Sequence, residues 1–154
     1  MAASEATAAL KTFFQSSSFA VAGASSDTSK FGHKVFAWYL AHSLPVTPLN
    51  PSTPSITALS EAHPTVPSPS AIPDPTHTSL SIITPPKVTR KVLEEAASVG
   101  VPAVWLQPGS FDEEGMRFAR ERFGTVIGGQ GGRGGEGWCV LVDGEGGLRG
   151  AGKL

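Results

Sequence analysis

The sequence lacks features on which several classes of protein depend. Its 154 residues include a single cysteine, Cys139, which excludes an internal disulfide framework and a cysteine-rich zinc site. No apolar run approaches the roughly 18 residues that a membrane span needs, so no membrane interaction is expected. The formal net charge is −1, and a nearly neutral chain has no overall attraction to nucleic acid.

The first residues, MAASEATAALKTFF, contain Glu5 and no long apolar segment, so they do not resemble a secretory signal. They also contain too little arginine for a transit peptide. We therefore expect an intracellular protein, and the cytoplasm is favoured over the mitochondrion.

Common signatures of nucleotide binding and of catalysis are also missing. No Walker A loop is present, and Gly23 does not begin a G-x-G-x-x-G motif. The four histidines have no metal-ligand spacing, and no G-x-S-x-G sequence marks a nucleophilic serine. Cys139 lies in the apolar run WCVLV, which favours a small buried side chain over a reactive thiol. We expect no metal and no catalytic residue, which favours a binding protein over an enzyme.

Short apolar runs alternate with amphipathic ones along the chain, and this alternation predicts an α/β domain. The expected helices cover residues 6–14, 31–42, 86–99 and 111–123, and the candidate strands cover 18–22, 45–49, 80–84, 103–106, 125–127 and 138–142. We predict a Rossmann-like doubly wound parallel sheet of about five strands with helices on both faces. Residues 1–154 are expected to form one domain.

Two segments do not fit this alternation. Residues 51–78 hold seven of the thirteen prolines, which predicts a long surface loop with one helical turn near residues 56–62. Residues 128–137 read GGQGGRGGEG, which predicts a mobile loop.

Ligands of a doubly wound sheet bind beyond the carboxyl ends of its strands. The first such junction, VAGASSDTSKFGHKV, has small residues that let backbone N–H groups approach an anion. Ser25 and Ser26 add hydroxyl groups, and Lys30 adds a positive charge at the start of the next helix. These features favour phosphate binding over a merely polar turn.

The later junctions contribute few titratable groups. Asn50 and Pro51 follow the second strand, where an NAD site usually has an acidic residue. Two interpretations of Asn50 have equal weight. Its side chain could contact a ribose or an adenine, or the residue could belong to a simple turn. The TPP of residues 84–86 and the QPG of residues 107–109 would form rigid walls.

These four junctions, in this order, resemble the small stand-alone CoA-binding proteins. That Rossmann-like domain is also found at the start of the α subunit of succinyl-CoA synthetase. The resemblance covers roughly residues 8–143, through VAGASSDTSKFGHKV, PVTPLNP, SIITPPKVTRKVLEEAASVGV and AVWLQPGS. The synthetases carry a phosphorylated histidine in a downstream domain, whereas this chain has no histidine after His77. Acyl-CoA ligase activity by this chain alone is therefore not expected.

The resemblance implies that CoA or acyl-CoA is the ligand. The Gly23 loop with Lys30 and Phe31 would hold the phosphates, and Asn50 with Pro51 would line the adenosine side. The TPP segment would face the pyrophosphate and the pantetheine arm, and the QPG segment would close the far wall. The full set of expected contacts is Gly23, Ala24, Ser25, Ser26, Lys30, Phe31, Asn50, Pro51, Thr84, Pro85, Pro86, Val88, Gln107, Pro108 and Gly109.

The leading hypothesis is a non-catalytic CoA-binding module that acts as a carrier, a sensor or a regulatory subunit. The alternatives are a small NADP(H)-dependent oxidoreductase and a nucleotide-binding regulatory or purely structural interaction module. A protein partner or a homodimer is compatible with each hypothesis.

Overall fold

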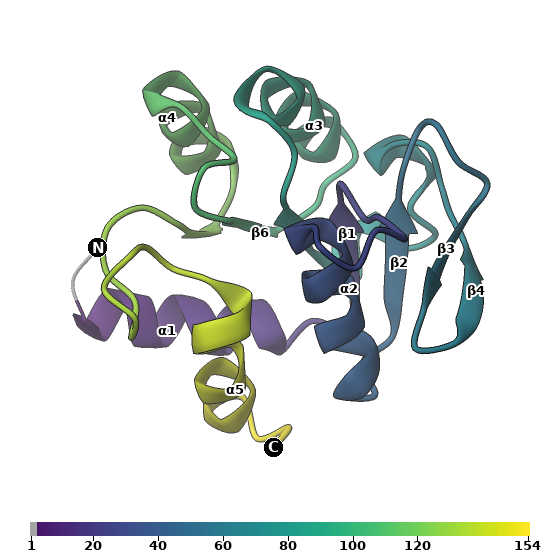
Figure 1. The fold of residues 1–154 in the computed structure, drawn as a ribbon. Coiled ribbons are helices and arrows are strands. Elements are labelled where there is room, and N and C mark those ends of the chain that lie inside the picture. Colours follow the sequence, from purple (N-terminus) through teal and green to yellow (C-terminus); the bar gives the residue numbers. More distant parts are fainter. Residues whose placement is uncertain (1–2) are drawn as a thin grey trace.

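The computed structural model describes residues 3–154, so the first two residues of the expected domain lie outside the described range. Its centre is a five-stranded parallel sheet with strand order β2-β1-β5-β6-β7 (Figure 1). The strands are β1 (Ser18–Ala22), β2 (Val46–Leu49), β5 (Thr78–Ile82), β6 (Ala103–Leu106) and β7 (Thr125–Ile127). The predicted doubly wound sheet is therefore confirmed.

Helices cover both faces of this sheet (Figure 1). One face carries α1 (Ala3–Phe14), α2 (Phe31–Ala41) and α5 (Val140–Gly150), and the other carries α3 (Pro86–Ser98) and α4 (Glu113–Arg122). Successive side chains of a strand point to opposite faces, so Val21 packs in the first core and Ala20 in the second. Aromatic rings fill the first core, where the ring centroids of Phe13 and Trp105 lie 5.6 Å apart.

Asp27, Thr28 and Ser29 come just before α2, and residues of these types often cap helices. Lys30 occupies the capping position, and its side chain makes no capping hydrogen bond. Asp27 instead closes a turn just before the helix, because its Oδ1 atom accepts hydrogen bonds from the backbone N–H and the hydroxyl of Ser29.

Residues 55–64 form an antiparallel hairpin, so the predicted helical turn near residues 56–62 is wrong. The hairpin pairs β3 (Ser55–Ala58) with β4 (Glu61–Pro64), and two short 3-10 helices, η1 (Pro69–Ala71) and η2 (Pro75–His77), follow it. Leu59 and Ser60 close it with positive φ angles of 50° and 66°. Ile56 and Ala58 are buried while Thr57 is exposed, and this alternation is the strand signal that the prolines concealed.

The strand predicted over residues 138–142 is also wrong, because the chain enters α5 at Val140. Two glycines allow this helix to pack closely against its neighbours. A Cβ atom on Gly147 would lie 2.6 Å from the ring of Phe14, and one on Gly144 would overlap Trp38. Glycine therefore serves helix packing here, although it is unfavourable in an isolated helix.

None of the helices described is both long enough and apolar enough to cross a membrane.

Candidate functional site

The chain reverses its winding direction between β1 and β5. The connection after β1 runs through α2 on one face of the sheet, and the connection after β5 runs through α3 on the other. Such a switch point leaves a crevice at the carboxyl ends of the two strands. A cavity of about 920 Å³ opens there, near the upper end of the usual range for small-molecule sites.

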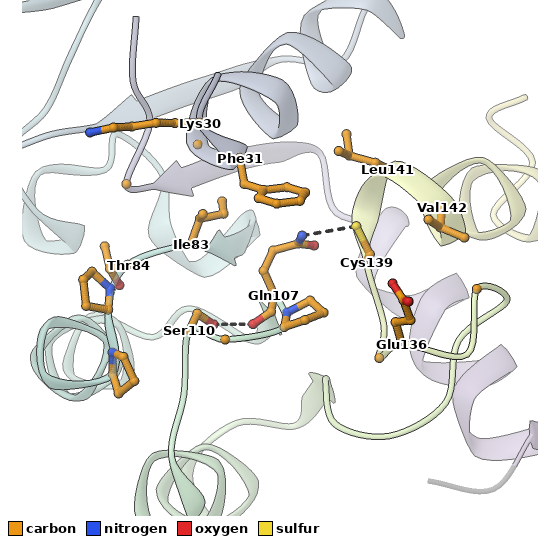
Figure 2. A pocket seen from close by; sticks show the side chains of 18 of the residues that line it. Lys30, Phe31, Ile83, Thr84, Gln107, Ser110, Glu136, Cys139, Leu141 and Val142 are labelled. Atoms are coloured by element: carbon orange, nitrogen blue, oxygen red, sulfur yellow. Dashed lines mark hydrogen bonds between the residues drawn. The ribbon is translucent and has the colours of Figure 1, made fainter. Parts of the chain in front are cut away.

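The cavity brings together most of the residues predicted from the four junctions (Figure 2). The predicted residues that line it are Gly23, Lys30, Phe31, Thr84, Pro85, Pro86, Gln107, Pro108 and Gly109. Those outside its lining are Ala24, Ser25, Ser26, Asn50, Pro51 and Val88. Ten further residues line the cavity and were not predicted as ligand contacts: Ser29, Gly32, Ile83, Ser110, Gly134, Glu136, Gly137, Cys139, Leu141 and Val142.

The start of α2 forms the first wall of the cavity, which is also its cationic end. Lys30 is exposed, and Phe31 and Gly32 place the first backbone N–H groups of the helix at the cavity. These N–H groups have no partner within a helix, and the helix dipole makes this end positive. Hydrogen bonds from Ser29 hold the pKa of Asp27 below its ordinary value, so ionised Asp27 fixes the approach to the helix. This end of the cavity is therefore suited to an anion.

The two serines of the first junction shape the loop. The Ser25 Oγ atom accepts a hydrogen bond of 3.0 Å from the Asp27 backbone N–H. The Ser26 Oγ atom accepts one of 2.9 Å from Thr57, which ties the loop to the β3–β4 hairpin. Ala24 is buried beneath them.

Asn50 also has a structural role. Its Nδ2 atom donates to the Ala24 carbonyl at 3.0 Å, and its Oδ1 atom accepts from the backbone N–H groups of Ser52 and Thr53. The side chain thus links the end of β2 to the first junction. This geometry matches the turn that the sequence left as one of two possibilities.

The start of α3 forms a second wall. Pro86 is the first residue of this helix, a position that suits its fixed φ angle and missing N–H. The hydroxyl groups of Thr84 and Thr89 share a hydrogen bond of 2.7 Å, which holds the turn in place. The Val88 side chain is 45% exposed, whereas Leu93 of the same helix is buried.

The third wall comes from Gln107 and the start of α5. Gln107 is 3% exposed, and its Oε1 atom accepts a hydrogen bond of 2.8 Å from the Val140 backbone N–H. Its Nε2 atom donates to the Cys139 Sγ atom at 3.3 Å (Figure 2). Cys139 is half-buried and lines the cavity, which corrects the expectation of a thiol sequestered in the core.

Hydrogen bonds hold the glycine-rich loop next to this wall. The buried carboxylate of Asp143 accepts from the backbone N–H groups of Arg133 and Cys139, at 2.8 Å and 3.0 Å. The Trp138 Nε1 atom donates to the Gln130 carbonyl at 3.2 Å. The loop is therefore fastened to α5, and it places Gly134, Glu136 and Gly137 at the cavity.

Large apolar side chains surround the opening between these walls. Phe31 is 55% exposed and Val142 is 44% exposed, and Leu141 lies near them at the start of α5 (Figure 2). Among residues 3–154, no cluster of three or more histidine, cysteine or acidic side chains could hold a metal ion.

The structure is a doubly wound α/β domain with a cavity at its switch point. The chain belongs to the CoA binding domain family, whose model matches residues 17–131. The match spans the first junction, the TPP segment and the QPG segment, and it ends before Cys139 and α5.

Solved structures from several microorganisms share the fold. A conserved hypothetical protein from Pyrococcus furiosus is 25% identical, with a TM-score of 0.65 over 82% of this chain and 97% of that one. A protein from Thermus thermophilus is also 25% identical, with a TM-score of 0.66 over 79% and 89%. A hypothetical protein from Pyrococcus horikoshii is 23% identical, with a TM-score of 0.69 over 79% and 82%. No curated protein matched the chain.

Proposed function

We propose that this protein binds CoA or an acyl-CoA reversibly at the switch-point cavity and does not catalyse a reaction by itself. The observation that carries this proposal is the family match over residues 17–131, which contains the starts of α2 and α3, two of the three helix starts that border the cavity. A carrier, a sensor or a regulatory subunit would each require such a site.

The cationic end of the cavity would receive the phosphates of CoA. The Lys30 ammonium group and the N–H groups of Phe31 and Gly32 provide charge-assisted hydrogen bonds for phosphate oxygens. Gly23 lets the ligand approach the backbone at the end of β1. Ser25, Ser26 and Asn50 would support this loop from behind through the hydrogen bonds described above.

The pantetheine arm would lie between the walls formed by residues 84–86 and 107–109. Its amides and methylene groups match walls that combine the rings of Pro85, Pro86 and Pro108 with the polar side chains of Thr84 and Gln107. Lys30 and Cys139 lie at separate ends of the cavity, so the ligand would extend across the carboxyl ends of β1, β5 and β6.

The set of titratable side chains supports binding rather than catalysis. The cavity lining contains Lys30, Glu136 and Cys139, and no histidine. General acid–base catalysis requires a proton donor or acceptor that contacts the reacting atoms. The described lining provides no pair of such groups next to a nucleophile.

Calorimetric titration under reducing conditions tests the proposal. We expect CoA to bind more tightly than dephospho-CoA and much more tightly than pantetheine, because phosphate contacts would dominate the affinity. Absence of binding by CoA and acyl-CoA would overturn the proposal. Tighter binding of NADPH than of CoA would instead support the small oxidoreductase.

A further inference from the structure

The cavity connects a cationic group at one end with the only thiol of the chain at the other. Figure 2 shows Lys30 and Cys139 on opposite sides of the cavity, with Phe31 and Gln107 between them. The groups of CoA match this arrangement, because its phosphates and its thiol are at opposite ends of the molecule. The cavity and the family match point to this ligand independently of the cysteine.

The contact between Gln107 and Cys139 has a defined orientation. A backbone N–H group can only donate, so the Val140 N–H fixes which end of the Gln107 amide carries the oxygen. The Nε2 atom must then face Cys139, and it donates to Sγ at 3.3 Å. Because Gln107 is buried, this N–H donor is held in place at the sulfur that faces the cavity.

We propose that Cys139 captures CoA covalently as a mixed disulfide when CoA arrives in oxidised form. This inference rests on the proposed function, since the nucleotide must first occupy the cavity. The oxidant is a low-molecular-weight disulfide that contains CoA, such as CoA disulfide. Gln107 is the positioning residue, because its N–H group stabilises negative charge on the Sγ atom during the exchange.

The reaction is a thiol–disulfide exchange. The Cys139 thiol loses its proton, and its sulfur attacks the CoA sulfur of the incoming disulfide. A bond forms between Sγ and that sulfur while the original S–S bond breaks. The departing thiolate keeps the electron pair of the broken bond and takes up a proton. Cys139 is oxidised and the leaving thiol is reduced, and an excess of another thiol reverses the step.

Intact-mass spectrometry tests this inference on the wild-type chain. CoA disulfide and oxidised glutathione are added separately at equal concentration, and the rate of adduct formation is followed. We expect one CoA adduct per chain, removed by dithiothreitol. It should form at least about tenfold faster than the glutathione adduct, because binding raises the effective concentration of the disulfide beside Sγ.

Two variants link the reaction to the site. Lys30→Ala should slow the reaction with CoA disulfide far more than the reaction with oxidised glutathione, whereas Lys91→Ala, outside the cavity lining, should change neither rate. Cys139→Ser should form no adduct with either reagent. Equal rates for the two disulfides in the wild-type chain, or no effect of Lys30→Ala, would overturn the inference and identify Cys139 as an ordinary accessible thiol.

The calorimetric titration separates this inference from the proposed function. Binding of reduced CoA without any adduct from CoA disulfide would overturn covalent capture and leave reversible binding in place. Absence of binding by reduced CoA would overturn the proposed function itself.

Discussion

Gly32, in the first turn of α2, packs against the carbonyl oxygen of Gly23 so closely that a Cβ atom on Gly32 would overlap that oxygen. Gly23 itself has a φ angle of 92°, which side chains rarely adopt. The two glycines together bring the positive end of α2 over the end of β1. The chain thus achieves the close approach of dinucleotide-binding folds without their G-x-G-x-x-G spacing.

Replacement of Gly32 by alanine should destabilise the fold, because the new methyl group must displace backbone atoms. We expect a loss of about 1–3 kcal/mol in the free energy of unfolding, measured by urea denaturation. Gly146→Ala is the matched control, because Gly146 is exposed in α5 and a Cβ atom added there would have no neighbour within 4 Å. The control should gain about 0.5–1 kcal/mol, so equal effects would contradict the role of Gly32.

Replacement of Lys30 by alanine should weaken CoA binding with little effect on stability, because the side chain is exposed. The loss of a charge-assisted hydrogen bond predicts a decrease of roughly 1.5–3 kcal/mol in binding free energy, measured by calorimetry. Lys91→Ala provides the control, since Lys91 is also exposed and lies outside the cavity lining. Unchanged affinity in Lys30→Ala would remove this residue from the phosphate site.

Replacement of Gln107 by leucine should destabilise the attachment of α5. The Val140 backbone N–H is buried and would lose its acceptor, which costs about 1–3 kcal/mol. Urea denaturation measures the total effect, and hydrogen exchange at the Val140 amide measures the local one. Gln130→Leu changes a side chain outside the cavity lining and should leave both measurements nearly unchanged.

Tyr39, the only tyrosine, should make the fold sensitive to alkali. Its hydroxyl shares a hydrogen bond of 2.7 Å with Ser81, and burial raises the pKa of its phenol well above the ordinary value of 10.0. Above about pH 10 the unfolded chain releases this proton while the folded chain retains it. The free energy of unfolding should therefore fall as the pH rises above about 10.

Phenolate absorbance in the native state tests this directly, because no other tyrosine contributes. We expect no ionisation near the ordinary pKa of 10.0 until the protein unfolds. Tyr39→Phe should remove this contribution to the pH dependence. A phenol that titrates normally in the folded chain would contradict the burial argument.

The sequence predicted the five parallel strands, because buried parallel strands are short apolar runs. The bounds of the third strand were wrong by two residues, since it was expected over 80–84 and β5 is Thr78–Ile82. β1 ends just before Gly23, and β6 lies between Pro102 and Gln107. The hairpin was missed because its strands have only four residues each, and burial alternates in β3 but not in β4. α5 was missed because the interior glycines Gly144 and Gly147 are favourable only where Trp38 and Phe14 pack against them.

The cavity was likewise predicted in part from the sequence and missed in part. The residues at the ends of β1, β5 and β6 were predicted because sheet topology alone brings them to one edge. The wall formed by the start of α5 depends on packing against residues that are distant in the sequence. Helical spacing of the buried Val140, Gly144, Gly147 and Leu148 was the available signal, and the high glycine content concealed it.

The segment after the β3–β4 hairpin also occupies the outer edge of the sheet. Val66 forms a parallel bridge with Leu49, accepts a hydrogen bond from the Asn50 N–H and donates one to the Pro48 carbonyl. Val66 therefore occupies the carboxyl end of the outer ladder of β2, and β7, at the opposite edge, is only three residues long. A strand from a second copy of the chain could pair along the full length of β2 only if Val66 first left its place, so this end of the edge is protected against the strand pairing that leads to aggregation.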